Sequence, residues 1–412
     1  MAEVAAGAIV AEQIISTGVE AGAAAVVARP SQPLTVVLTQ IATTPAEDES
    51  LALARSHHTV TVINNRAYIF GGNKEDGQLC SNEVHAVSLP GEQQGNGEYA
   101  CYPAVGEEDA CPAPRVNHAA CARGDALIIH GGQEGDGQAP NEASCLWLWD
   151  ANTLKWEKIE AVGKTPESRS KHQIFYDQAR DLLVLHGGLE DGEPTKDIWV
   201  FDFTTRLWNE LPAAPAVSLA AQYVDSTLYS IGGDSDVHGS IHYIKPGTSE
   251  DQTEAPEWST IDFPTNPLAP GPRPRVGGAM SHVTTGYGRH YLLCLFGSRK
   301  DVDISSDETF TEDHPFYSDM WSLQLPSGGF TGSHVKDVIR DAIPGVESGE
   351  FSWHELEIAP TELTQTTGKV HPGPRGFFGA DTCLDGKGVI MWGGVNAKGE
   401  TEADGWLLKI GS

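Results

Sequence analysis

The chain has 412 residues, of which 40 % are apolar, so it can bury a large hydrophobic core. Its formal net charge of −30 at pH 7 excludes nucleic acid and anionic membranes as expected partners, because both would be repelled over a wide surface. Seven cysteines without a Cys-x-x-Cys pair indicate a reduced, cytoplasmic protein rather than a disulfide framework, although Cys101 and Cys111 could pair.

Residues 1–33 form an alanine-rich segment that differs from the rest of the chain. Its apolar residues recur at helical spacing, at Val4, Ala8, Ala11, Ile15 and Val19. This periodicity predicts a short amphipathic helix. No basic residue precedes Arg29, so neither a secretory signal nor a membrane-binding basic face is expected. We expect the helix to dock on the remaining domain; a partner-binding or dimerising helix and a disordered tail are the alternatives.

One motif recurs through residues 34–410. Six short apolar runs each end in a pair of small residues: Gly71-Gly72, Gly131-Gly132, Gly187-Gly188, Gly232-Gly233, Gly297-Ser298 and Gly393-Gly394. The interval is roughly 45 to 65 residues and longer only where inserts lie, which predicts an array of equivalent units rather than one mixed core.

The residues around each pair also repeat. An arginine opens five of the units, an acidic-x-Trp sequence such as Asp197-Ile198-Trp199 follows several pairs, and a lone tryptophan such as Trp208 closes several units. Each unit therefore predicts four short strands, separated by Gly, Pro, Asn and Asp. This order of residues resembles the kelch motif and covers about Arg55 to Leu408. The resemblance implies an all-β fold, a β-propeller of four-stranded blades around a central channel.

The two ends of the repeat predict how the propeller closes. The sixth unit ends at Trp406-Leu407-Leu408 without an outermost strand, whereas residues 34–39 form a strand-like run before the first unit. We expect this N-terminal strand to complete blade six, which gives a six-bladed ring.

Two inserts interrupt blade five, at residues 299–318 and 326–350. The first is rich in aspartate and glutamate, but its spacing is unlike that of a calcium loop, so a solvated acidic loop is preferred over a cation site. The second has apolar residues such as Val335 and Ile339 behind Ser333, which predicts a short surface helix.

The candidate binding residues lie where each innermost strand begins. They are Arg55, Arg115, Arg169, Arg275 and Arg375, together with His58, His118 and His172, each three residues after an arginine. Blade four has no such arginine. If these side chains gather at one mouth of the channel, they suit a carboxylate or phosphate. The alternative is a structural role, in which they satisfy backbone carbonyls inside each blade. His130 and His186, which precede glycine pairs, are expected in the channel wall.

The resemblance extends to function. In kelch substrate adaptors, arginines matching Arg115, Arg275 and Arg375 contact an acidic peptide, which implies a binding or scaffold module that presents an arginine-lined face to a protein, a peptide or a small anionic ligand. The alternative is a small-molecule metabolic enzyme, an isomerase, lyase or cyclase, because the plant nitrile-specifier proteins are similar kelch propellers. Their iron-binding Glu-x-x-x-Asp-x-x-x-His pattern does not occur between Asp301 and His314. No common hydrolase, nucleotide or zinc-protease motif is present, and neither a cofactor nor a metal is expected.

Overall fold

The computed structural model describes residues 33–41, 53–90, 98–106, 110–140, 145–232, 240–246, 256–263, 270–286, 288–299, 315–326, 351–359 and 370–411. The helix expected within residues 1–33, the acidic stretch of the first insert and the helix expected near Val335 lie outside these ranges. The described residues form strands and turns and no helix, so none of them forms an apolar helix that could cross a membrane.

Six sheets of four or five strands contain most of the described strands. Sheet 1 consists of β2 (Thr59–Ile63), β3 (Arg66–Phe70), β4 (Val84–Ser88) and β5 (Tyr99–Tyr102). Sheet 2 consists of β6 (Ala119–Arg123), β7 (Ala126–His130), β8 (Leu146–Asp150) and β9 (Lys155–Ile159). Sheet 3 consists of β11 (Gln173–Asp177), β12 (Leu182–His186), β15 (Ile198–Asp202) and β16 (Leu207–Leu211).

Sheet 4 consists of β17 (Ser218–Val224), β18 (Thr227–Gly232), β19 (Ser240–Ile244) and β20 (Ser259–Asp262). Sheet 5 consists of β21 (Ala279–Thr284), β22 (His290–Leu295), β23 (Met320–Gln324) and β24 (Ser352–Glu355). Sheet 6 has the order β27 (Gly379–Cys383), β28 (Gly388–Trp392), β30 (Gly405–Ile410), β1 (Thr35–Ile41) and β25 (Glu357–Ile358). Two small sheets pair β10 (Arg169–Ser170), β13 (Leu189–Glu190) and β14 (Glu193–Pro194), and β26 (Arg375–Gly376) with β29 (Val395–Asn396).

Local turn chemistry explains why the strands fold back on one another. The turn between β2 and β3 is Asn64-Asn65, and both residues have positive φ, 49° and 61°. Two successive positive φ values are typical of the tight hairpin turn whose twist matches that of the strands, and asparagine tolerates them well. The same geometry recurs between β17 and β18 at Asp225-Ser226.

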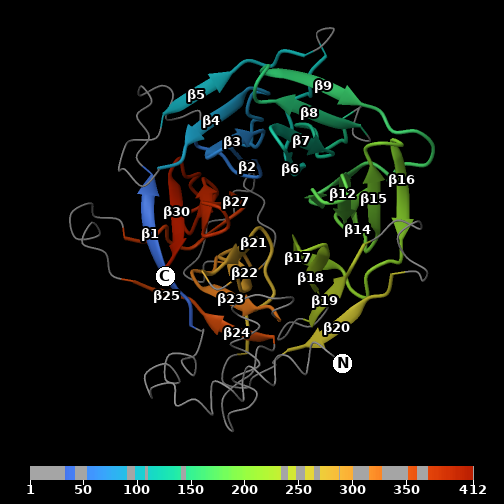
Figure 1. The fold of residues 1–412 in the computed structure, drawn as a ribbon. Coiled ribbons are helices and arrows are strands. Elements are labelled where there is room, and N and C mark those ends of the chain that lie inside the picture. The colour runs from blue at the N-terminus through green and yellow to red at the C-terminus, as the bar shows by residue number, and fades with distance from the viewer. Residues whose placement is uncertain are drawn as a thin grey trace, which may run out of the picture.

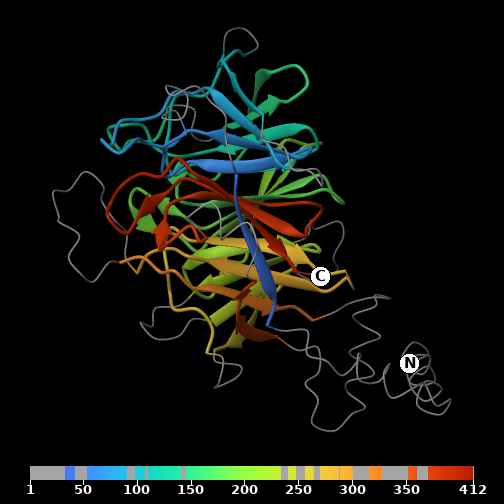
Figure 2. The ribbon, with the colours of Figure 1, turned by 90° about the vertical axis from the view of Figure 1, so that its left-hand side faces the viewer.

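The sheets are arranged around a common centre, with their first strands innermost (Figure 1). Each of the strands β2, β6, β11, β17, β21 and β27 contacts the innermost strands of the sheets before and after it, and β27 contacts β2. β1 pairs antiparallel with β30 from Val36↔Ile410 to Ile41↔Gly405, and parallel with β25. Figure 2 shows β1, in blue, running beside the red C-terminal strands.

The hydrophobic core lies between neighbouring sheets rather than in one central mass. Six clusters of buried residues each join two consecutive sheets. Leu38 of β1, for example, belongs with Leu293 and Leu295 of sheet 5 in one cluster, and Val60 of sheet 1 belongs with Ile390 of sheet 6 in another. Because middle strands are covered on both faces, they are nearly continuous apolar runs, such as Leu182–His186, in which every residue is buried.

Candidate functional site

The five arginines that open the repeats are buried within their own repeat units. Each is 4 % exposed or less. Each donates from Nη1 to a backbone carbonyl where the apolar run of its own unit ends: Arg55 to Gly71 (2.9 Å), Arg115 to Gly131 (2.9 Å), Arg169 to Gly187 (3.2 Å), Arg275 to Phe296 (2.9 Å) and Arg375 to Gly393 (3.1 Å). The arginine thereby holds the start of the first strand against the end of the second.

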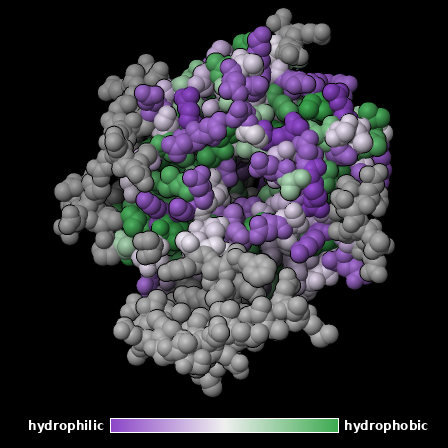
Figure 3. All heavy atoms as spheres, in the orientation of Figure 1, coloured by the Kyte–Doolittle hydropathy of each residue, from purple (hydrophilic) through white to green (hydrophobic). Residues whose placement is uncertain are grey.

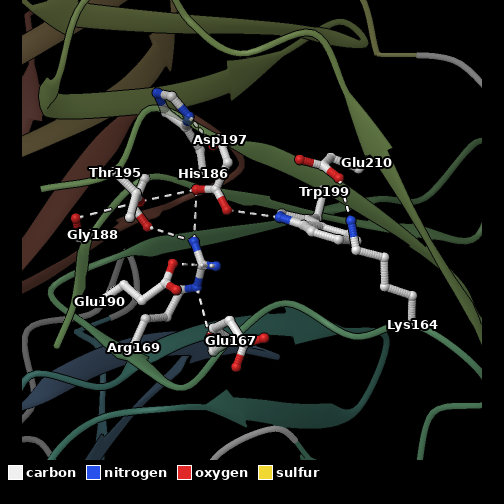
Figure 4. Close-up of polar contacts among 11 residues, drawn as sticks. Lys164, Glu167, Arg169, His186, Gly188, Glu190, Thr195, Asp197, Trp199 and Glu210 are labelled. Carbon is white, nitrogen blue, oxygen red and sulfur yellow. Dashed lines mark hydrogen bonds and ion pairs between the residues drawn. The ribbon is translucent and has the colours of Figure 1, made fainter.

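In sheets 3, 5 and 6 an aspartate completes this arrangement. Figure 4 shows it for sheet 3, where Arg169 points at Asp197 and Asp197 points at the indole of Trp199. The Arg169 Nη1 to Asp197 Oδ1 distance is 2.7 Å, and Trp199 Nε1 donates to Oδ2 at 2.7 Å. Burial acts to raise the pKa of Asp197, but the hydrogen bond and charge of Arg169 outweigh it and hold this pKa below its ordinary value. Asp319 and Asp404 occupy the equivalent positions with Arg275 and Arg375.

The expected arginine-lined opening is therefore not what the described residues form. Each guanidinium is directed at its own chain, because a buried cation needs hydrogen-bond partners and the carbonyls and aspartates of the same sheet are the nearest acceptors. None of the five arginines lines the central cavity described next.

A cavity of about 390 Å³ lies where the first strands of all six sheets begin. Its lining includes consecutive residues from every sheet: His57-His58, Asn117-His118, Lys171-His172-Gln173, Val217-Ser218-Leu219, Val276-Gly277-Gly278 and Phe377-Phe378. His186 of sheet 3 contributes as well, and Gly188, Leu189 and Pro194, which follow it in the same repeat unit, supply the rest. In the space-filling view of the face seen in Figure 1, hydrophilic residues gather around a central hollow (Figure 3).

A chain of backbone hydrogen bonds runs around the cavity through residues two positions after each arginine. The N–H of Phe377 donates to Gly277 (2.6 Å), His57 to Phe377 (2.9 Å), Asn117 to His57 (3.1 Å) and Lys171 to Asn117 (2.7 Å). All five residues have φ between 55° and 63°. A left-handed conformation costs a non-glycine residue of the order of 1 kcal/mol, so the bonds that join the sheets hold His57, Lys171 and Phe377 in strained backbone.

His58, His118 and His172 do line the cavity, and each is buried. His118 Nε2 is 2.9 Å from Thr59 Oγ1 of the preceding sheet, and His172 Nε2 is 2.9 Å from His130 Nδ1. Burial first, and the adjacent arginine second, lowers the pKa of His118 to about 3. The pKa values of His58 and His172 are also well below the ordinary value, chiefly because of burial. These imidazoles are therefore neutral at pH 7.

Part of their hydrogen-bonding capacity is unused. Within the described part of the chain, the Nδ1 atoms of His118 and His172 are buried without a hydrogen-bond partner. A buried polar atom without a partner costs free energy, and where it borders a cavity it is a natural contact for a ligand.

His130 and His186 do not meet each other. His130 is fully buried and contacts His172 of the next sheet, whereas His186 lines the cavity with Nε2 3.2 Å from Ser230 Oγ of sheet 4. Both therefore connect neighbouring sheets.

Three residues that give the cavity its aromatic and its cationic side were not among the candidates expected from the repeat. His57 and Phe377 stack, with ring centroids 4.5 Å apart and planes at 20°, and Lys171 lies in the sheet 3 part of the lining. Their common position, two residues after a repeat arginine, is a signal that the repeat itself contains. Cys101 and Cys111, which were a candidate pair, form no disulfide with each other.

A family model described as the KLHDC2/KLHL20/DRC7 Kelch-repeats domain matches residues 57–287 and, in a second placement, residues 117–349. Acyl-CoA-binding domain-containing protein 4 of Arabidopsis thaliana is 25 % identical over 273 residues, which cover 63 % of this chain and 37 % of that protein. Kelch domain-containing protein 3 of Homo sapiens is 26 % identical over 272 residues, which cover 60 % of this chain and 65 % of that protein. The chain thus spans less than two thirds of the length of these relatives.

The solved structure of YjhT superposes with a TM-score of 0.55 at 12 % identity, and the match covers 87 % of this chain and 97 % of that one. At this identity the likeness shows a shared fold alone. The matches give no support to the alternative of a metabolic enzyme.

Proposed function

The chain belongs to the Kelch-repeat family, and from this premise we propose that it is a protein-binding scaffold: a closed six-bladed propeller that holds an anionic group of its partner, or a small anionic ligand, in the central cavity. The observation that carries the proposal is the charge of the cavity. The protein has a formal charge of −30, yet the described lining residues include Lys171 and five histidines and no aspartate or glutamate.

Closure of the ring is supported by three contacts between the two ends of the repeat. β27 contacts β2, β1 pairs with β30 in sheet 6, and one hydrophobic cluster joins Val60 and Ile69 of sheet 1 to Ile390 of sheet 6. A ring closed in this way fixes the six first strands relative to one another, so the cavity is held in shape before a ligand arrives. Preorganisation of this kind reduces the entropy cost of binding.

The chemistry of the lining separates into two sides. The repeat units of sheets 6 and 1 supply Phe377, Phe378 and the stacked ring of His57, whereas the unit of sheet 3 supplies Lys171 and Gln173. Since the buried histidines are neutral, they offer hydrogen bonds rather than charge. We infer a ligand group that places a carboxylate or phosphate near Lys171 and an apolar part against the aromatic side.

The test is capture of partners from cell extract with the full chain and two charge-reversal variants. Lys171→Glu introduces a carboxylate at the cavity, and Lys155→Glu makes the same change at an exposed residue of the outer strand β9. We expect Lys171→Glu to lose partners that the parent chain and Lys155→Glu both retain, while all three melt at similar temperatures. Equal capture by the two variants contradicts the proposal.

A further inference from the structure

Sheet 1 differs from its equivalents at the position where the other sheets hold an aspartate and a tryptophan. In sheets 3, 5 and 6 the sequence Asp-x-Trp places an indole N–H on the carboxylate, at 2.7 to 2.8 Å. In sheet 1 the same two positions are Glu83 and His85. Glu83 has a longer side chain than the aspartate of the other sheets but also ends in a carboxylate. His85 replaces an indole, which can only donate a hydrogen bond, with an imidazole, which can also offer a nitrogen lone pair.

A third side chain of a type that can bind metal, Cys101, lies on the neighbouring strand of sheet 1. His85 of β4 is the direct cross-strand partner of Cys101 of β5, so both side chains lie on the same face of sheet 1. Glu83 is two residues before His85 and shares that face. One ligand atom from each of Glu83, His85 and Cys101 lies within 4.8 Å of the other two. From this geometry we infer that the three residues bind a zinc-class transition-metal ion.

His85 is prepared for this role. Its side chain is buried, at 2 % exposure, and its Nδ1 is 2.8 Å from the hydroxyl of Tyr99. When Nδ1–H donates to Tyr99, the lone pair is on Nε2, and among the described residues Nε2 is buried with no hydrogen-bond partner. A second hydrogen bond that fixes the tautomer is characteristic of metal-binding histidines.

The other two ligands supply the charge. A thiolate and a carboxylate together neutralise a divalent ion, and the Arg55 guanidinium interacts electrostatically with both Glu83 and Cys101. Ser81 Oγ donates to Glu83 Oε2 at 2.7 Å, which orients the carboxylate.

The donor set selects the class of metal. One sulfur, one nitrogen and one oxygen ligand suit zinc and its neighbours, whereas magnesium and calcium prefer oxygen alone. Three protein ligands leave a fourth tetrahedral position for water. Because His85 and Cys101 are on different strands, the metal would also fasten the outermost strand β5 to β4.

The experiment loads the full-length protein with zinc, removes the excess by gel filtration and measures bound metal by mass spectrometry. We expect one zinc per chain in the parent protein and in Cys145→Ser, and loss of that zinc in Cys101→Ser. Removal of one of three protein ligands should weaken zinc binding by about a hundredfold or more, since even outer-shell changes cost 10- to 100-fold. Cys101 is exposed, so its serine variant should fold, and a melting curve recorded in chelator checks this.

A spectroscopic measurement identifies the sulfur ligand directly. Cobalt bound to the parent protein should show a thiolate-to-cobalt charge-transfer band in the near ultraviolet, absent in Cys101→Ser and reduced in His85→Gln. Magnesium in excess should not displace the cobalt. Stoichiometric zinc in the Cys101→Ser variant, or a parent protein that retains no zinc after gel filtration, overturns the inference. Neither outcome bears on the central cavity.

Discussion

The imidazole of His172 occupies the space into which a side chain on Gly131 would project: a Cβ at that position would lie 2.6 Å from His172 Cε1 and 2.5 Å from the carbonyl oxygen of Arg169. The same contact joins Gly71 to His118 and Gly393 to His58, at 2.7 and 3.0 Å. The first glycine of a pair therefore makes room for the histidine of the next sheet. The second glycine makes room for the segment that leads into the first strand of its own sheet, since a Cβ on Gly132 would lie 2.8 Å from the Val116 carbonyl.

This interlocking predicts that two glycines with the same backbone conformation differ in their tolerance of alanine. Gly131 and Gly187 have φ of 62° and 61°, but around Gly187 the nearest atoms to a Cβ are 3.5 and 3.7 Å away, because Ser218 stands where sheets 1, 2 and 3 have a histidine. We expect Gly187→Ala to lower the free energy of unfolding by about 1 kcal/mol, the cost of positive φ. Gly131→Ala should cost about 3 kcal/mol or more, since it also displaces packed backbone. Urea unfolding measures both, and equal losses would contradict the interlocking.

The buried arginines predict a large loss of stability when one is removed. Arg375→Ala would leave the Asp404 carboxylate, which is 10 % exposed, without its ion-pair partner at 2.6 Å. Breaking a buried pair from one side costs about 3 to 5 kcal/mol. The control is Lys158→Ala, which removes the partner of the mostly exposed Glu160 and should cost less than about 1 kcal/mol. Similar unfolding curves for the two variants would argue against a structural role for the arginine.

The buried histidines predict acid sensitivity between pH 7 and pH 5. Burial lowers the pKa of His118 and His130 to about 3 in the folded protein, whereas the unfolded chain has histidines near 6.5. Below pH 6.5 the unfolded state therefore binds more protons, and stability falls by up to about 1.4 kcal/mol per pH unit for each such histidine.

Asp381 acts in the opposite direction. Desolvation raises its folded-state pKa to about 6, so its contribution is present at low pH and is lost as the pH rises from its unfolded value through 6. Its effect on the free energy of unfolding offsets the effect of at most one buried histidine. We expect the free energy of unfolding to fall as the pH is lowered from 7 to 5, and His118→Gln to reduce that slope. A slope that His118→Gln leaves unchanged would show that this ring does not carry the effect.

The strand β1 predicts that the N-terminal end of the repeat stabilises the whole molecule. Leu38 is 3 % exposed and belongs to the cluster that joins sheets 5 and 6, so Leu38→Ala should cost about 2 to 5 kcal/mol. Ile358→Ala, at a residue 46 % exposed on β25, serves as the control and should cost little. If the ring is one cooperative unit, tryptophan fluorescence and circular dichroism should report a single, coincident transition in both variants. Two separated transitions in Leu38→Ala would contradict cooperative closure.

Sequence alone determined the repeat and the four-stranded units, because each unit contains its own strand and turn signals, such as Asn64-Asn65 between β2 and β3. It also identified the histidines His58, His118 and His172, which line the cavity. It left two roles open for the arginines, because a guanidinium after a proline can face either a ligand or its own backbone, and the spacing is the same in both cases.

Only the tertiary structure decided between these roles. The acceptors of Arg375, which are Gly393 and Asp404, lie 18 and 29 residues away in sequence, and their position depends on how the strands of sheet 6 pair. The cluster of Glu83, His85 and Cys101 likewise exists only because β4 and β5 pair in one register. A repeat specifies which strands form, because its signals are local, whereas the surroundings of a side chain depend on strand pairing and on the neighbouring sheet.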